Sequence, residues 1–259
     1  MATSFKQILA DTDELIPTFV LSRMVHPVVI ELFGLAGGYR GFWLDLEHAS
    51  ISTEQIVMAG VAARANNFDC FVRMPPTGYW QVTQCLEAGA GGVMGAQIHS
   101  AEQAAQFVSW AKFPPEGSRG INASGRDGDY THKPMDQFVI HANRRSMVAI
   151  QIETLGAIDQ IDAIAALPGV DMLFIGPGDL SLSLGVVGQL HHEKMWEAIG
   201  RVAAAAKRHG KAWGAVVLDP QFAIRAIELG CRMPTIGTDA LALRFGIDTL
   251  QKTFEACFP

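Results

Sequence analysis

Short apolar runs alternate along the whole chain with longer segments that have the periodicity of helices. The runs are rich in β-branched and aromatic residues, and a polar junction follows most of them. Short, mostly apolar strands separated by helix-length segments are typical of a parallel sheet covered by helices. The pattern predicts eight strands: Pro17–Leu21, Gly41–Asp45, Phe68–Arg73, Gly92–Ala96, Met147–Ile152, Met172–Ile175, Trp213–Val217 and Pro234–Ile236.

Two helix starts are marked by the same motif. Ser52-Thr-Glu-Gln55 and Ser100-Ala-Glu-Gln103 both have the spacing of a capping box. In that motif the serine oxygen accepts a hydrogen bond from a free backbone N–H at the helix start, and the glutamine side chain reaches back to the cap residue. We therefore expect both helices to begin at these serines.

Eight alternating strand–helix units in about 250 residues have the size of a TIM barrel. The main alternative is a doubly wound open sheet, which usually has a glycine-rich turn after its first strand. Here that turn reads Leu21-Ser22-Arg23-Met24, without glycine. No linker or change in composition divides the chain. The prediction is an α/β protein, a single (β/α)8 barrel domain over residues 1–259.

Two segments stand apart from the repeat. The connection from Phe113 to Arg145 is long, with glycines, prolines and several charges, and we expect it on the barrel face away from the chemistry. The last segment, Asp239 to Phe258, is a helical pattern with apolar residues at three- and four-residue steps. Those residues could pack on any surface, including that of a second subunit.

Composition narrows the class of protein. Apolar residues make up 49% and charged residues 18% of the chain, so a large core is expected and disorder is not. A net charge of −6 argues against nucleic acid as a partner. We find no apolar run long enough for a bilayer and no signal peptide, so no membrane partner is expected. The cysteines are scattered without a CxxC motif, which predicts reduced thiols in a cytoplasmic protein: Cys70, Cys85, Cys231 and Cys257.

Ionisable residues collect where the predicted strands end. In barrels the active site forms at the carboxyl ends of the strands. The second strand runs into Asp45-Leu-Glu-His48, the third ends at Arg73, the sixth runs into Gly176-Pro-Gly-Asp179, and the eighth runs into Gly237-Thr-Asp239. The fifth ends at Gln151-Ile-Glu153. This rim is where we expect the chemistry.

Glu153 and Asp179 end adjacent parallel strands, whose axes lie about 4.8 Å apart. Two such carboxylates would repel each other unless a divalent cation lay between them, and oxygen ligands suit Mg²⁺ or Mn²⁺. Gln151 points to the same face as Glu153 and could orient a ligand or a water. The alternative is that Asp179 caps a helix and Glu153 pairs with an arginine.

His48 and Arg73 each have two readings. A histidine in this rim could transfer protons, or it could be a hydrogen-bonded structural residue. Arg73 could bind a carboxylate in bidentate fashion or form a surface salt bridge. No lysine follows a predicted strand, which argues against a Schiff base. The loops after the seventh and eighth strands are acidic and lack a glycine-rich nest, which disfavours a phosphate ester as substrate.

At these residues the chain resembles the metal-dependent HpcH/HpaI aldolases of the phosphoenolpyruvate/pyruvate barrel superfamily. The resemblance runs roughly from Phe19 to Phe254, with its motifs in family order. The matching stretches are Asp45-Leu-Glu-His-Ala49, Phe71-Val-Arg73, Leu86-Glu-Ala-Gly89, Pro114-Pro-Glu-Gly-Ser-Arg-Gly120, Gln151-Ile-Glu-Thr154 and Phe174-Ile-Gly-Pro-Gly-Asp-Leu-Ser181.

The resemblance implies a role for each matching residue. Glu153 and Asp179 would hold a divalent metal, Mg²⁺ or Mn²⁺ with Co²⁺ as a further candidate, and Gln151 would lie beside it. His48 would be the catalytic histidine, with Glu87 as its acidic partner. Arg73 would contact the keto oxygen of the pyruvate portion, and backbone N–H groups around Gly178 would bind its carboxylate. The family is similar in forming homo-oligomers, so we expect a trimer or hexamer, with the C-terminal helix exchanged between subunits.

The implied reaction is reversible cleavage of a 4-hydroxy-2-oxo acid to pyruvate and an aldehyde through a metal-bound enolate. A 2-keto-3-deoxy sugar acid and 4-hydroxy-2-oxoheptanedioate are both candidate substrates. The family usually has Pro where Ser50 stands, and Gly95-Ala-Gln-Ile-His99 also departs from its pattern, so the aldehyde partner stays open. The alternatives are an oxaloacetate-type decarboxylase using the same metal and enolate, a CoA-thioester lyase, and a non-catalytic ligand-binding barrel.

Overall fold

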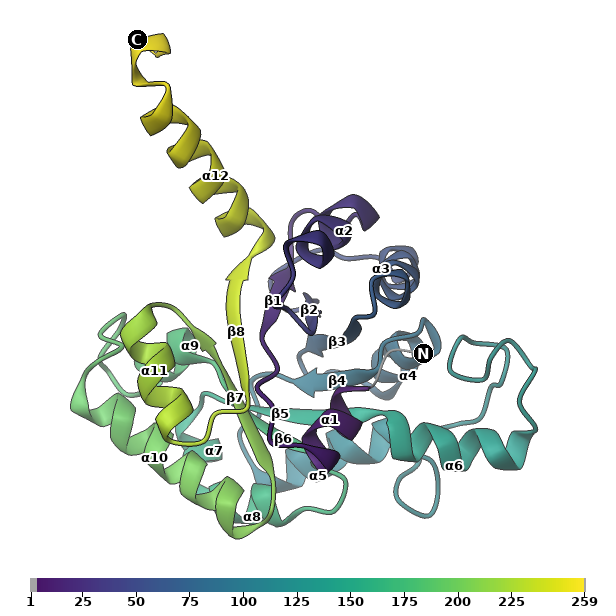
Figure 1. Cartoon of the computed structure of the whole chain (residues 1–259). Helices are drawn as coiled ribbons and strands as arrows, with labels where there is room; N and C mark the ends of the chain where they lie inside the picture. The colour runs from purple at the N-terminus through teal and green to yellow at the C-terminus, as the bar shows by residue number, and fades with distance from the viewer. Residues whose placement is uncertain (1–3, 259) are drawn as a thin grey trace.

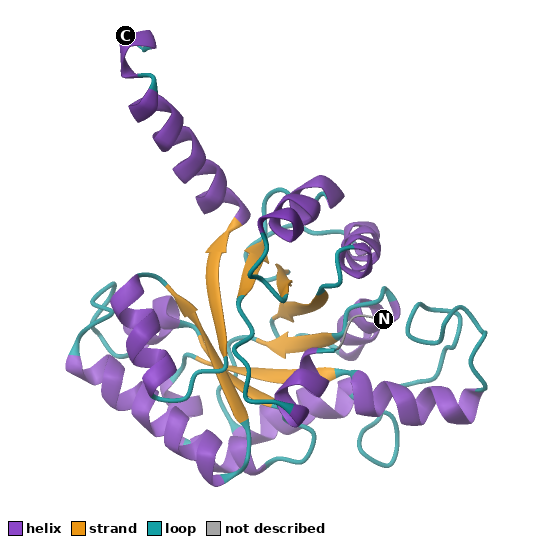
Figure 2. Ribbon diagram, in the orientation of Figure 1, coloured by secondary structure: helices purple, strands orange, loops and turns teal. Residues whose placement is uncertain are grey.

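Eight parallel strands close into one barrel in the computed structural model, which describes residues 4–258 (Figures 1 and 2). Each strand pairs with its neighbours in chain order, and β8 closes the barrel against β1. The strands are β1 (Thr18–Leu21), β2 (Gly41–Asp45), β3 (Asp69–Met74), β4 (Gly92–Gly95), β5 (Met147–Ile152), β6 (Met172–Ile175), β7 (Ala212–Val217) and β8 (Met233–Thr238). All eight predicted strands are confirmed, with bounds within two residues of those expected.

Helices follow the strands and cover the outside of the barrel, which confirms the (β/α)8 fold and excludes an open sheet (Figure 2). They are α1 (Phe5–Asp11), α2 (Pro27–Ala36), α3 (Thr53–Ala65), α4 (Tyr79–Glu87), α5 (Ala101–Ala111), α6 (Met135–Arg145), α7 (Leu155–Asp159), α8 (Ile161–Ala166), α9 (Pro177–Ser183), α10 (Glu193–Arg208), α11 (Pro220–Glu228) and α12 (Asp239–Thr253), with a 3₁₀ turn at Glu255–Cys257. Helix α1 precedes the barrel and buries Phe5 in its interior, where the Phe5 N–H donates to Asp69 at 2.8 Å.

The inside and the outside of the barrel are separate cores, because successive side chains of a strand point to opposite faces. The inner core includes Trp43, Phe71 and Phe174, and the two pairs formed by Trp43 with the other rings have centroids 6.2 and 6.4 Å apart. The outer core lies between strands and helices and is larger. The inward-facing side chains of each strand are therefore mostly apolar in the middle of the barrel. Inward-facing catalytic side chains can lie only at the ends of the strands.

Local capping signals are confirmed at one helix and in part at the other. Ser52 and Gln55 form both bonds of the predicted capping box. At α5 the Ser100 hydroxyl accepts from the Gln103 N–H at 3.1 Å, but the Gln103 side chain bonds the N–H of His99 at 2.8 Å rather than that of Ser100. The second box is therefore half formed, because the glutamine reaches one residue further back.

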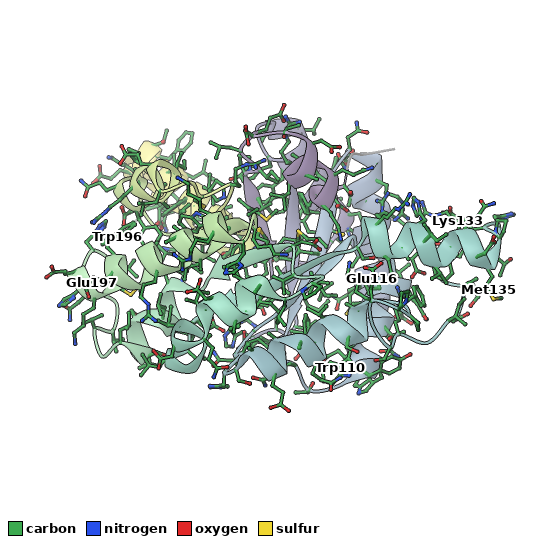
Figure 3. The ribbon with its side chains drawn as sticks, turned by 90° about the horizontal axis from the view of Figure 1, so that it is seen from below. Trp110, Glu116, Lys133, Met135, Trp196 and Glu197 are labelled. Carbon is green, nitrogen blue, oxygen red and sulfur yellow. The ribbon has the colours of Figure 1, made fainter. Side chains whose placement is uncertain are left out.

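The long connection before β5 is not all loop. Its last third is helix α6, which we did not predict as a helix. Phe138 and Ala142 lie four residues apart on α6 and pack with Phe113, so one face of the helix is buried. In the view from below, Lys133 and Met135 lie together at the outer end of α6 (Figure 3). The irregular part, residues 112–134, runs along α4. Arg126 contacts Glu87 near the amino end of the barrel, where we expected this segment, but the Gly120 N–H donates to the Tyr79 hydroxyl at the start of α4, on the side of the carboxyl end of β3.

Helix α12 does not pack along the barrel wall as the other outer helices do. It projects away from the end of β8 (Figure 1), and its apolar residues are about half exposed: Leu243, Ile247, Leu250 and Phe254. The regular helix ends at Thr253, five residues before the predicted end at Phe258. Within residues 4–258 we find no helix with the length and hydropathy needed to cross a bilayer.

Candidate active site

The polar residues at the carboxyl ends of the strands continue the inward-facing apolar rows. Asp45 follows Trp43 by two positions on β2, and Arg73 follows Phe71 by two on β3. The register of the parallel pair sets Asp45 directly beside Arg73. Because the side-chain period of a strand is two, the same rows that fill the barrel turn polar at its carboxyl end. The predicted rim therefore consists of the last inward-facing residues of each strand.

Arg73 is buried and held from three directions. Its Nε and Nη2 atoms donate to the two oxygens of Asp45 at 3.1 and 2.7 Å, a bidentate pair. Its Nη1 atom lies 3.2 Å from Glu47 Oε2, and the guanidinium stacks 4.9 Å from the Trp43 ring. Charge-assisted bidentate pairs fix an arginine in direction as well as in place. The surface salt bridge considered from sequence is excluded, because the pair is buried.

Glu153 is completely buried, and neither of its oxygens contacts an arginine. Oε1 accepts from the backbone N–H of Gln97 at 2.9 Å, and Oε2 accepts from Gln151 Nε2 at 2.5 Å. Gln151 Oε1 is buried without a partner within residues 4–258. The predicted proximity of Gln151 and Glu153 is confirmed, and the alternative of a Glu153–arginine pair is excluded.

Gly176 lies where β6 turns into α9, directly against this pair. A Cβ atom at this position would collide with Glu153 Oε2 and with Gln151 Nε2. Only glycine lets the backbone pass so close to the carboxylate. The first glycine of the Gly176-Pro-Gly-Asp179 turn is therefore needed because any side chain there would displace Glu153 and Gln151.

Asp179 is in the first turn of α9 but does not cap it, because the cap position is Gly176 and no side chain bonds there. Its carboxylate has no hydrogen bond or ion pair with any residue from 4 to 258. Gly178 is exposed beside it, and a Cβ there would meet nothing within 4 Å. Asp179 thus presents free oxygens next to open space, and its capping alternative is excluded.

The electrostatics of this rim favour a cation. Burial raises the pKa of Glu153 to about 7; the charges of Glu47 and Asp179 raise it too, while the Gln97 N–H and Arg73 oppose them. The one guanidinium here is already paired with Asp45. Carboxylate and amide oxygens are the ligands that Mg²⁺ and Mn²⁺ prefer. The residues present therefore fit a divalent ion.

The structure also limits how many protein ligands such an ion could have. Over the described part of the chain, no three carboxylate, imidazole or thiolate side chains lie close enough to ligate one ion. Mg²⁺ is usually bound through one or two carboxylates, with waters and substrate oxygens as its other ligands. Glu153 and Asp179 are such a pair.

His48 lies at the mouth of the barrel with 57% of its side chain exposed. Its backbone N–H donates to Asp45 Oδ1 at 3.2 Å, and its Nε2 is 3.8 Å from Glu47 Oε2, too far for a hydrogen bond. The imidazole is therefore free to meet a ligand entering from solvent. The structural alternative, a histidine fixed by side-chain hydrogen bonds, does not describe it.

Glu87 is not near His48 within one chain, contrary to the pairing expected from the resemblance. Helix α4 returns from the carboxyl end of β3 to the amino end of β4, and Glu87 is its last residue. Its carboxylate accepts from Asn122 at 3.3 Å, and its backbone oxygen accepts from the Arg126 N–H. The reason is topological: helices that return across the barrel end on the opposite face.

Sequence reasoning placed Asp45 and Glu47 at the rim without giving them a role, and it missed the role of Gln97. Asp45 and Glu47 hold Arg73, and their two-residue spacing matches that of Gln151 and Glu153, which could have identified them. Gln97 acts through its backbone N–H and has a left-handed φ of 50°, which is uncommon for a residue other than glycine. No side-chain pattern could have indicated that role.

Comparisons with known proteins agree with this geometry. The profile of the HpcH/HpaI aldolase/citrate lyase family matches residues 30–244. A 5-keto-4-deoxy-D-glucarate aldolase of Klebsiella pneumoniae is 31% identical over 232 residues, 90% of each chain. A protein of the same name from Salmonella paratyphi C is also 31% identical, over 234 residues and 90% of each chain.

Solved structures show the same fold over nearly the full length. An HpcH/HpaI aldolase from Desulfitobacterium hafniense is 30% identical and superposes with a TM-score of 0.92, covering 100% of this chain and 98% of its own. An HpcH/HpaI aldolase/citrate lyase family protein from Burkholderia cenocepacia is 32% identical with a TM-score of 0.88, covering 96% and 98%. From the barrel, the strand-end residues and these matches together, the chain belongs to the HpcH/HpaI aldolase family and is a carbon–carbon lyase.

Proposed function

We propose that the protein is a class II aldolase that reversibly cleaves a 4-hydroxy-2-oxo acid to pyruvate and an aldehyde, with a divalent metal as cofactor. The observation that carries this proposal is a pair of carboxylates at one rim beside a fixed arginine. Glu153 is buried and oriented by the Gln97 N–H and the Gln151 amide, and Asp179 is half-buried without a partner within residues 4–258. The names of the relatives favour a 2-oxo sugar acid as substrate, and 5-keto-4-deoxy-D-glucarate is the first compound to test.

The chemical difficulty of the cleavage is the electron pair left on the carbon next to the oxo group. A divalent cation supplies positive charge beside the carboxylate and the 2-oxo oxygen of the pyruvate portion. Glu153 and Asp179 would hold that cation, and Gln151 would direct Glu153 by its hydrogen bond. The backbone N–H groups around Gly178 would bind the substrate carboxylate.

Arg73 and His48 would act on the two ends of the bond that breaks. The N–H groups of Arg73 not bonded to Asp45 would donate to the 2-oxo oxygen as negative charge develops there. His48 would accept the proton of the 4-hydroxyl group as the C3–C4 bond breaks, and would return it during condensation. General acid–base help of this kind is typically worth about 10²–10⁴-fold in rate.

In this proposal Asp45 and Glu47 are the acidic residues next to His48 and Arg73 within one chain. Glu87 would serve a catalytic histidine only from a neighbouring subunit. We further propose that the protein is a homo-oligomer, because α12 leaves an apolar face open. Its free thiols, at Cys70, Cys85, Cys231 and Cys257, are compatible with the cytoplasm.

The test is metal removal combined with one substitution, measured as pyruvate released. Dialysis against EDTA should abolish cleavage of 5-keto-4-deoxy-D-glucarate, and added Mn²⁺ or Mg²⁺ should restore it. Full turnover in excess EDTA would refute the metal. His48→Ala should lower cleavage about 10²–10⁴-fold while sparing oxaloacetate decarboxylation, which removes no hydroxyl proton. An equal loss of both activities would show that His48 is not the base for the hydroxyl group.

A further inference from the structure

A small cavity of about 100 Å³ lies at the other end of the barrel from the candidate active site. It is bounded by the last turn of α3, the segment Gly89–Gly91 before β4, the loop before α6, and α6 itself. Its charged lining is mainly basic: Arg64, Arg126, Lys133, His141 and Arg145, with Asp127 and Asp129. Lys133 is visible from below, at the outer end of α6 (Figure 3).

The two carboxylates of the lining are already paired. Asp127 accepts from Arg119 at 2.5 Å, and Asp129 pairs with Arg126 and, at 2.7 Å, with Lys133. The lining therefore contains four permanent positive charges against two negative ones. In a protein of net charge −6, such a local excess is not a consequence of composition.

Two of the arginines have no carboxylate of their own. Within residues 4–258 the guanidinium groups of Arg64 and Arg145 make no hydrogen bond or ion pair. Burial, and then the positive charge of Arg126 and Arg145, lower the pKa of Arg64. One further acid, Asp69, is buried and accepts from the Phe5 N–H, and the charge of Arg145 lowers its pKa against the larger, raising effect of burial. An anion placed between these groups would be stabilised by their combined positive charge.

We propose that this cavity binds a small divalent oxyanion of the size of inorganic phosphate, held by Arg64 and Arg145 together with Arg126 and Lys133. Guanidinium groups match the geometry of phosphate oxygens in bidentate fashion. The volume is enough for a tetrahedral ion of this size, and the basic side chains of the lining would surround it. The site is separate from the aldolase centre, and the proposal does not depend on that function.

The bound ion would add a charged link between three elements. Arg64 belongs to α3, Arg145 to α6, and Arg126 and Lys133 to the loop between α5 and α6. That loop contains three consecutive residues with left-handed φ, Asp129, Tyr130 and Thr131, at 51°, 54° and 74°. Such backbone is held only by its surroundings. We therefore expect the ion to slow hydrogen exchange over residues 119–134.

The test is titration of the intact, metal-free protein with inorganic phosphate by calorimetry at constant ionic strength. Without a divalent ion, the candidate active site keeps only Arg73, which is already bonded to Asp45, and any phosphate bound there would persist in variants of Arg64 and Arg145. Saturable binding is expected, together with slower exchange of residues 119–134. Arg64→Gln and Arg145→Gln should each weaken binding at least about tenfold. Lys207→Gln, an equal loss of charge on the exposed side of α10, should change nothing.

Three results would overturn the proposal. The first is no saturable binding by the wild type, and the second is unchanged affinity in both arginine variants. The third is an equal loss in Lys207→Gln, which would mean attraction to overall charge only. Arg64 is partly exposed near the end of its helix, so its variant is expected to fold if Arg145→Gln does not.

Discussion

Glu153 shows how much of this site depends on single backbone positions. Its two oxygens accept hydrogen bonds from the backbone N–H of Gln97 and the side-chain amide of Gln151. The missing side chain of Gly176 leaves room for the Glu153 carboxylate and the Gln151 amide. The left-handed backbone at Gln97 turns its N–H toward the carboxylate. Residues that orient a ligand in this way are as important as the ligand itself, and their loss typically lowers metal affinity 10–100-fold.

Gly176→Ala tests this arrangement. The added methyl group would displace the Glu153 carboxylate and the Gln151 amide, so we expect Mn²⁺ affinity to fall about 10–100-fold. Mn²⁺ binding can be measured by electron paramagnetic resonance without any substrate. Gly200→Ala on α10 is the matched control, because a Cβ there meets nothing within 4 Å. Equal Mn²⁺ affinity in both variants would show that Glu153 is not the metal ligand.

At the scale of elements, Asp239 connects the last strand of the barrel, β8, to the turn that follows the first strand, β1. It begins α12 after β8, and its carboxylate accepts from the N–H groups of Ser22, Arg23 and Met24 after β1, at 3.1, 2.8 and 2.6 Å. Burial by itself would raise the pKa of Asp239, but these bonds and one from Ala240 hold it below its usual value. The acid that we grouped with the rim chemistry therefore has a structural role in joining β8 to the turn after β1.

Asp239→Asn should destabilise the protein at neutral pH. An amide accepts fewer and weaker hydrogen bonds than a carboxylate, so the expected loss at pH 7 is about 1–2 kcal/mol in the free energy of unfolding. Because the folded pKa lies below the unfolded value of about 3.9, the carboxylate stabilises the fold above that pH. The stabilisation is lost as the pH falls through the folded pKa.

The urea midpoints of wild type and Asp239→Asn should therefore differ at pH 7 and converge below about pH 4. Asp248→Asn serves as the control, because the Asp248 carboxylate is exposed and forms a loose ion pair, 3.5 Å from Arg244 on the same helix. A difference that persisted unchanged into acid would show that the charge of Asp239 is not what joins the two elements.

At the scale of the whole molecule, α12 is the part least explained by one chain. It projects from the barrel with an apolar stripe about half exposed, and a further apolar groove lies beside β8, lined in part by Phe33, Tyr39 and Phe245. Soluble monomers rarely expose so much contiguous apolar surface. This is the structural basis for expecting a homo-oligomer.

Leu250→Asp should break up that assembly. A buried, unpaired charge at an apolar interface is strongly unfavourable, so the mass in solution should fall from a trimer or hexamer toward the 28.0 kDa of one chain. Light scattering coupled to gel filtration measures this directly. Gln251→Asp adds the same charge at the neighbouring position and should leave the mass unchanged. A wild-type mass of one chain would contradict the expected oligomer.

The strands and the main site residues could be predicted from sequence because their signals are local. A buried parallel strand is a short apolar run, and a polar residue directly after it lies at the carboxyl rim. Glu153, Asp179, Arg73 and His48 were placed at the rim in this way, and the structure has them there. Helix α6 was missed because its fully buried apolar residues are only Phe138 and Ala142, among charged residues that are typical of a loop.

The sequence by itself determined the barrel, its strands and the oxygen-rich rim, since hydrophobic periodicity and chain order are enough to specify them. The tertiary structure alone decided which side chains meet. Asp45 pairs with Arg73 through strand register, Glu153 receives a backbone N–H from Gln97, and Glu87 lies at the opposite face because α4 returns across the barrel. Such contacts join residues far apart in the chain, and they depend on distances that exist only once the sheet has closed.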